Sequence, residues 1–121
     1  GPEHLFRLYE PTTWPGARLP HAWLDDGTAV QDRLPYEGFT LLRLGRTQAD
    51  TSALENALRA TGAPLAVLDL PDDAPRQVYR CDLLLLRPDL HVVWRGNRPP
   101  EDAREVAVTA TGNAERPGPR S

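Results

Sequence analysis

Hydrophobic residues gather in four short runs along the chain. The run GFTLLRLG, residues 38–45, has the length and the flanking glycines of a buried strand. The run PLAVLDL, residues 64–70, is almost continuously apolar, as is typical of a strand covered on both faces. Residues 81–87 and 91–95 are joined by PDL, residues 88–90, in which proline and aspartate favour a turn. The pattern predicts two strands followed by an antiparallel hairpin.

A helix is predicted between the first two strands, in the segment DTSALENALRATGAP. Its apolar residues, including Leu54 and Leu58, recur at helical spacing on one side. Ser52 and Glu55 have the spacing of a capping box, and Gly62 followed by a proline predicts the end of the helix. Strand, helix and strand form a βαβ unit, whose right-handed crossover makes the two strands parallel.

Two further elements complete the prediction. HAWL and TAVQDRL flank the turn sequence DDG, residues 25–27, which predicts a short hairpin before the first strand. After the PDL hairpin, Val106, Ala107 and Ala110 have helical spacing, and Gly112 ends that pattern. The order of elements predicts an α/β domain with a thioredoxin-like fold: a small mixed sheet with a βαβ unit, a β-hairpin and a C-terminal helix.

Proline placement predicts the limits of this domain. Several prolines keep residues 1–21 extended, so we expect them to form a linker that leads into the domain. Residues 22–112 hold all the predicted elements and form the thioredoxin-like domain. Residues 113–121, AERPGPRS with the preceding asparagine, are expected to be a disordered tail.

Composition narrows the possible functions. The net charge of −3 offers no basic surface for a nucleic acid, so DNA and RNA are not expected partners. No apolar run approaches the ~20 residues that span a bilayer, and the beginning of the sequence lacks a signal-peptide pattern. We therefore expect a cytoplasmic protein that is not bound to a membrane.

Catalytic patterns are missing from the sequence. The single cysteine, Cys81, excludes a thioredoxin-type redox pair, and we expect it to be a buried hydrophobic residue. The histidines are too far apart to suggest a metal site, and the carboxylate pairs occur where turns and first helical turns ordinarily carry acids. No catalytic, cofactor-binding or metal-ligating residue is therefore expected in this chain.

The stretches PGARLPHAWLDDG, GFTLLRLG and VYRCDLLLLRPDLHVVWRG, in this order and spacing, resemble the C-terminal domain of FAD-dependent aromatic-ring hydroxylases, the phenol hydroxylase-like flavoprotein monooxygenases. The resemblance covers roughly residues 14–112. It implies a larger parent enzyme that uses FAD and NAD(P)H to hydroxylate an aromatic substrate, with FAD-binding and substrate domains as partners of this one. Since this chain contains no GxGxxG motif, we expect it to be inactive alone.

The resemblance also implies a surface for domain packing or dimerisation. Arg18, His21 and Trp23 lie in or beside the linker, and together with Arg95 they are candidates for contact with another domain or with a second subunit of a homodimer. Sequence leaves the alternative that Trp23 and Trp94 both pack in the core. A second reading of the function is a stand-alone thioredoxin-fold binding module without redox activity.

Two details of the hairpin give further expectations. Related hydroxylases often have glycine where this chain has Leu90, so we expect either a different turn type or a strained leucine that glycine would replace without loss of stability. Regular alternation along HVVWR places Val92 and Trp94 on one face of the strand, with Trp94 mostly buried.

Overall fold

The computed structural model describes residue 13, residues 15–35 and residues 37–112. The predicted disordered tail and the first part of the linker lie outside these residues. The elements follow one another as η1 (Val30–Arg33), β1 (Phe39–Leu44), α2 (Ser52–Ala60), β2 (Leu65–Leu70), α3 (Asp73–Tyr79), β3 (Leu83–Leu86), β4 (Val92–Gly96) and α4 (Ala103–Thr111).

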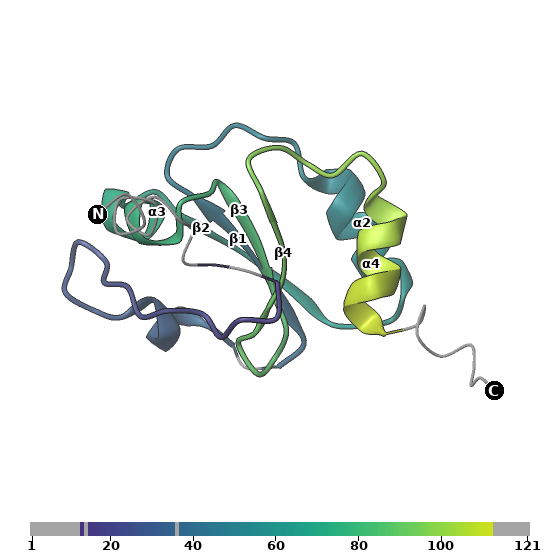
Figure 1. Cartoon of the computed structure of the whole chain (residues 1–121), viewed down its shortest axis with the longest axis horizontal. Coiled ribbons are helices and arrows are strands. Elements are labelled where there is room, and N and C mark those ends of the chain that lie inside the picture. The colour runs from purple at the N-terminus through teal and green to yellow at the C-terminus, as the bar shows by residue number, and fades with distance from the viewer. Residues whose placement is uncertain (1–12, 14, 36, 113–121) are drawn as a thin grey trace, which may run out of the picture.

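The strands form one mixed sheet in the order β2-β1-β3-β4 (Figure 1). β1 and β2 are parallel, as the predicted βαβ unit requires, while β3 is antiparallel to both β1 and β4. The register places Phe39 opposite Leu65 and Thr40 opposite Leu86, so β1 is hydrogen-bonded along both edges. The two strands of the βαβ unit and the hairpin are therefore confirmed.

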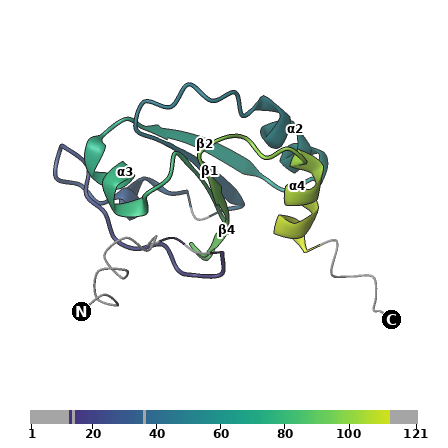
Figure 2. The same ribbon diagram turned by 45° about the horizontal axis from the view of Figure 1, so that its top comes forward.

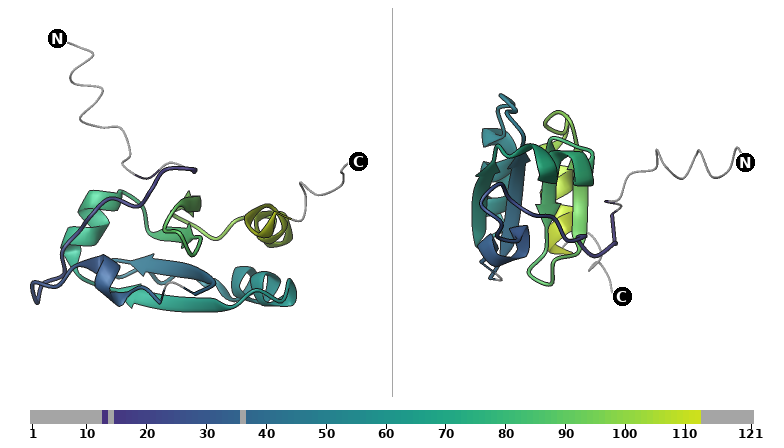
Figure 3. Two further views of the ribbon diagram at one scale, coloured as in Figure 1. Left: turned by 90° about the horizontal axis from the view of Figure 1, so that it is seen from below. Right: turned by 90° about the vertical axis from the view of Figure 1, so that its left-hand side faces the viewer.

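Helices cover both faces of the sheet. α2 and α4 lie side by side on one face, whereas α3 and the N-terminal segment lie on the other (Figures 1 and 2). The view along the sheet in Figure 3 separates these layers. This arrangement of a βαβ unit, a connecting helix, a hairpin and a final helix confirms the thioredoxin-like α/β fold.

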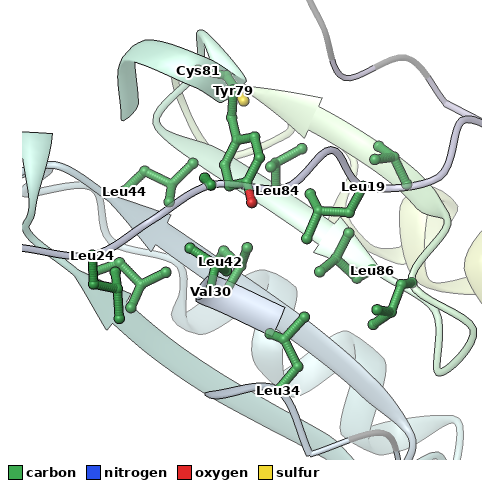
Figure 4. Packing of buried hydrophobic residues seen from close by; sticks show 14 residues of the cluster. Leu19, Leu24, Val30, Leu34, Leu42, Leu44, Tyr79, Cys81, Leu84 and Leu86 are labelled. Carbon is green, nitrogen blue, oxygen red and sulfur yellow. The ribbon is translucent and has the colours of Figure 1, made fainter. Parts of the chain in front are cut away.

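The core has two parts, one on each face of the sheet. On the α3 face, leucines of β1 and β3 contact Tyr79, Cys81 and residues of the N-terminal segment such as Leu19 and Leu24 (Figure 4). On the other face, Leu54 and Leu58 of α2 and Ala107 of α4 cover the sheet. Because every side chain of β3 is buried, this strand is packed on both faces, which explains the unbroken run of four leucines.

The N-terminus of α2 differs from the predicted capping box. Thr51, not Ser52, is the cap residue, and its hydroxyl donates a hydrogen bond of 2.7 Å to Oε2 of Glu55. The amide of Ser52 donates to Oδ1 of Asp50 at 3.0 Å. The predicted capping box is therefore wrong: the Glu55 amide donates to the Thr51 carbonyl at 2.9 Å, and the Ser52 hydroxyl donates to Asp50 at 2.7 Å instead of accepting from Glu55. The predicted end at Gly62 is confirmed by its φ of +89°.

Helix α3 was not predicted from the sequence. Its seven residues begin with an aspartate and carry a proline in the first turn, both ordinary at a helix start. The predicted hairpin around DDG is only half present: Gly27 has a φ of +86° and the Leu24 amide bonds to Thr28 O at 2.8 Å. The second arm forms η1 in place of a strand, and Trp23 and Ala29 make an isolated bridge.

Strand β4 contains an irregularity that overturns the predicted alternation. Val92 is opposite Leu86 and Trp94 is opposite Leu85, so one extra residue stands in β4 at this point. The bulge turns Val92 toward the α3 face and Trp94 toward the α2 and α4 face. Trp94 is partly buried, but it does not share a face with Val92 as predicted. The C-terminal helix follows as predicted and ends at Gly112, whose φ is +77°.

Candidate interdomain contact surface

Trp23 points away from the core. It is 58% exposed, and no other large hydrophobic side chain in the described ranges is classed as exposed. Its neighbours Ala22 and Leu24 are buried, so the extended backbone alternates between the core and solvent and directs His21 and Trp23 outward. Core packing of Trp23, which the sequence left as an alternative, is therefore wrong.

The rings of His21 and Trp23 stack on each other. Their centroids are 6.5 Å apart and their planes make an angle of 22°. The backbone beneath them is fixed, because the Val30 amide donates to the Ala22 carbonyl at 2.9 Å and Trp23 bridges Ala29. The result is a flat aromatic platform held by a hydrogen-bonded turn.

Carboxylates surround the turn that supports this platform. Oδ1 of Asp26 accepts hydrogen bonds from the Thr28 hydroxyl at 2.6 Å and from the Thr28 amide at 3.0 Å. These bonds, with the nearby Arg33 guanidinium, hold the pKa of Asp26 below its ordinary value, so the group is negatively charged at neutral pH. The Asp25 amide donates to the Asp72 carboxylate, which brings the start of α3 against the turn.

Arg95 makes hydrogen bonds within the domain. Its Nε donates to the hydroxyl of Thr13 at 3.1 Å, and its Nη2 donates to the carbonyl of Arg80 at 2.8 Å. Thr13 is fully buried and in turn donates from its hydroxyl to the Tyr79 carbonyl at 2.8 Å. Arg95 therefore ties the N-terminal segment to the end of α3.

Arg18 lies at the other end of the same segment. Its side chain is exposed and its backbone bridges His91 beside the hairpin. Gly16 donates to the Val92 carbonyl at 2.7 Å and Leu19 donates to the Leu90 carbonyl at 2.8 Å, so the segment runs along the hairpin. Of the four candidate contact residues, the structure joins only His21 and Trp23 to each other.

Outside these residues, the described chain contains one cysteine and a hollow beside β4 and α4. Cys81 is buried, and burial raises the pKa of its thiol, which makes a reactive thiolate unfavourable. The hollow, of about 180 Å³, is lined by Val93, Trp94, Glu105, Val106 and Thr109. Within the described residues no three His, Cys, Asp or Glu side chains are grouped as a metal site.

The N-terminus of helix α2 carries an acidic side chain. The Asp50 carboxylate accepts from both the amide and the hydroxyl of Ser52, and these bonds lower the pKa of Asp50. A negative charge therefore lies beside the first amide of α2, where it is favourable. In addition, no helix in the described part of the chain is long and apolar enough to cross a bilayer.

Sequence reasoning missed the carboxylates around Trp23. The pairs Asp25-Asp26 and Asp72-Asp73 were each interpreted as ordinary turn or helix-start residues, and each is indeed in such a position. What sequence could not give is their proximity, because the hydrogen bond between Asp25 and Asp72 joins residues 47 positions apart. The unpredicted helix α3 is the element that brings the second pair to the turn.

Comparison with known proteins adds a family match. The model of the family described as "Aromatic-ring hydroxylase, C-terminal" matches residues 12–114. The FAD-dependent monooxygenase apdD of Emericella nidulans is 38% identical over 117 residues, which cover 92% of this chain and 19% of that protein. The FAD-dependent monooxygenase opdD of Penicillium oxalicum is 33% identical over 114 residues, which cover 88% of this chain and 22% of that protein.

A solved structure shares the fold. The rebeccamycin biosynthetic enzyme RebC is similar with a TM-score of 0.75 and 33% sequence identity, over 86% of this chain and 20% of RebC. The chain thus spans about a fifth of the length of these relatives.

Proposed function

Because this chain belongs to the aromatic-ring hydroxylase C-terminal family, we propose that it is the C-terminal domain of a larger FAD-dependent monooxygenase that hydroxylates an aromatic substrate. The family match over residues 12–114 carries this proposal. Two relatives are FAD-dependent monooxygenases, and RebC has been solved with reduced flavin. FAD, with NAD(P)H as its reductant, is the cofactor pair that we assign to the larger protein.

The domain itself has a structural role in this proposal. Its thioredoxin-like sheet lacks the thiol pair that redox chemistry would need, since Cys81 is the only cysteine of the sequence and is buried. At the N-terminus of α2, Asp50 already accepts from the Ser52 amide, which supports placing the dinucleotide elsewhere. We therefore assign flavin binding and hydroxylation to the FAD-binding and substrate domains of the larger protein, and packing against them to this domain.

The contact that we assign to this role includes His21 and Trp23. Apolar surface exposed to water is unfavourable, and a partner that covers the indole removes that surface from water, so a large exposed aromatic on a fixed backbone favours an interface. Arg18 remains a candidate for the same contact because its side chain is exposed. Arg95 is assigned instead to the orientation of the linker, since its guanidinium donates to Thr13 in that segment and to the carbonyl of Arg80.

Flavin titration tests whether flavin binding belongs to the other domains of the larger protein. The 121-residue chain is expected to show no saturable FAD binding in the micromolar range and no NADPH consumption above background. The longer protein that contains it is expected to purify with FAD and to consume NAD(P)H when an aromatic substrate is added. Stoichiometric FAD binding by the 121-residue chain would contradict the assignment.

The upstream reading frame separates the proposal from the alternative of a stand-alone module. The proposal requires that the reading frame continue upstream and encode a strand, a GxGxxG loop and a helix. A start codon directly before residue 1 would favour the stand-alone binding module. The measurement is a DNA sequence and does not depend on the folding of any variant.

A further inference from the structure

The exposed aromatic platform lies within a strongly acidic surface, which we call the Trp23 patch. Its residues come from the turn, from η1 and from the start of α3: His21, Trp23, Asp25, Asp26, Asp32, Arg33, Asp72 and Asp73. Five aspartates against one arginine give the patch a net charge of −4 with histidine neutral, whereas the entire sequence carries −3. The elements that carry these residues meet at the turn, where the Asp25 amide donates to the Asp72 carboxylate and Arg33 donates to Asp26.

The charges of this patch are largely uncompensated. Arg33 is the one basic residue of the patch, and it pairs with Asp26 at 3.0 Å. Asp32 and Asp73 are exposed, and neither forms an ion pair with a residue of the described part of the chain. The pKa of Asp26 is lowered by its hydrogen bonds to Thr28, so proton uptake does not relieve the charge near neutral pH. A surface of this kind attracts a partner of opposite charge.

We propose that the Trp23 patch binds a basic surface, bearing lysine or arginine side chains, on the FAD-binding or substrate domain of the same polypeptide. This inference rests on the proposed function and adds the chemistry of the partner. A cationic head group stacks favourably on the face of a tryptophan, and the surrounding aspartates supply its counter-charges. The stacked His21 ring supports the tryptophan from one side.

Charge also decides between this partner and a second copy of the chain. In a two-fold symmetric dimer the same patch would meet itself, and two surfaces of net charge −4 would repel each other. A contact within one polypeptide avoids this repulsion if the facing domain is basic. The location fits as well, because the N-terminal segment that leads into the domain crosses the α3 face next to the turn (Figure 3).

The lysine content of the chain allows a specific cross-linking test. All 14 basic side chains among Lys and Arg are arginines, so the sequence contains no lysine. A carbodiimide joins carboxylates directly to lysine amines, and any such bond from the Trp23 patch must therefore end outside these 121 residues. The experiment uses the full-length protein, mixed from ¹⁵N-labelled and unlabelled preparations, so that bonds within one copy and between copies differ in mass.

The expected result is cross-linking of Asp25, Asp32 or Asp73 to lysines of the preceding domains, within one copy, with a yield that falls as salt is raised. Trp23→Ala should reduce this yield roughly threefold to tenfold. Glu101, an exposed carboxylate before α4, is the matched control and should give little cross-linking. Equal yields from Glu101 and the patch, or bonds only between copies, would overturn the proposal.

A second readout covers a partner surface that contains only arginine. Hydroxyl-radical oxidation of Trp23 in the full-length protein should be slow and should become several-fold faster in the charge-reversed variant Asp32→Arg, but not in Glu101→Arg. Fast oxidation in the unmodified protein would exclude a covered Trp23. If the full-length protein holds FAD and another face of this domain is protected instead, the proposed function stands and only the Trp23 patch is wrong.

Discussion

The amide of Leu90 donates a hydrogen bond to the carbonyl oxygen of Arg87 at 2.9 Å, and this bond closes the hairpin turn at a residue whose φ is +68°. Leucine is unfavourable in this left-handed conformation, as the sequence led us to suspect. The side chain nevertheless lies in the core, where it is 5% exposed. Burial and backbone strain therefore act in opposite directions at the same residue.

Leu90→Gly is predicted to destabilise the domain, in contrast to the expectation from sequence. Glycine relieves about 1 kcal/mol of backbone strain, but loss of a buried leucine costs roughly 2–5 kcal/mol. Leu90→Ala is the matched control, because it removes most of the side chain and keeps the strain. In urea unfolding, Leu90→Gly should be less stable than the parent and no less stable than Leu90→Ala. A parent-like midpoint for Leu90→Gly would show that the buried contacts contribute little.

Gly38 and Gly45 flank strand β1, and both have positive φ angles, +71° and +64°. They differ in the room available for a side chain. A Cβ on Gly38 would lie 2.5 Å from the Pro64 carbonyl oxygen, whereas a Cβ on Gly45 would lie 3.5 Å from Cγ of Arg76. Gly45→Ala should cost about 1–2 kcal/mol of unfolding free energy, from conformation alone. Gly38→Ala should cost about 1–3 kcal/mol more, because the β1 and β2 ends must separate. Equal losses in thermal melts would contradict the close approach.

The sheet was predictable from sequence because its strands carry two separate signals, an apolar run and turn residues at its ends. β3 is wholly apolar and β1 mostly so, both are bounded by turn residues, and Gly62 ends the helix between β1 and β2. Helix α3 was missed because its signals are local and its seven residues are too few for periodicity to stand out. The bulge in β4 was missed because nothing in the sequence HVVWR marks one of its residues as extra, so regular alternation was assumed.

The candidate site was predicted in part. Trp23 and His21 were named from their position in the linker, and their exposure follows from an extended chain with Ala22 and Leu24 turned inward. Their acidic surroundings depend on the contact between Asp25 and Asp72, which no local pattern encodes. Arg95 was named for the same surface, but its partners Thr13 and Arg80 lie inside the domain, and side-chain direction across three elements is not readable from sequence.

Thr13 is predicted to anchor the N-terminal segment through its hydroxyl. Thr13→Val keeps the shape of the side chain but removes the donor to the Tyr79 carbonyl and the acceptor for Arg95, which should cost about 1–3 kcal/mol. Thr13→Ser retains the hydroxyl, loses one methyl group and should cost about 1 kcal/mol or less. Chemical denaturation of both variants provides the comparison. The anchor role would be wrong if the valine variant were the more stable of the two.

Trp23→Ala is predicted to leave the stability of the domain almost unchanged. The side chain is 58% exposed, so its truncation should change the free energy of unfolding by no more than about 0.5 kcal/mol. The far-UV circular dichroism spectrum and the urea midpoint should match those of the parent. A loss above 2 kcal/mol would mean that Trp23 is part of the core, and it would remove the basis for a free aromatic platform.

Trp94 and Gly96 should be energetically coupled. Trp94 packs partly buried beside β3, and a Cβ placed on Gly96 would lie 2.9 Å from Cζ2 of its ring. Gly96→Ala alone should therefore cost about 1–3 kcal/mol through displacement of the indole. Trp94→Ala alone should cost about 2–3 kcal/mol, below the usual loss for a fully buried tryptophan.

The double variant of Trp94 and Gly96 tests this contact directly. With the indole removed, the added methyl group at residue 96 has no ring to displace, so Gly96→Ala should cost less than about 0.5 kcal/mol in the Trp94→Ala background. The coupling energy should then be about 1 kcal/mol or more, measured by urea unfolding of the four proteins. Leu83→Ala is the control background, because Leu83 is paired with Gly96 but its truncation leaves the indole in place. In that background Gly96→Ala should keep its full cost. Additive losses for the Trp94 and Gly96 substitutions would show that the indole does not lie against Gly96. The bulge in β4 would then not bring these two residues into contact.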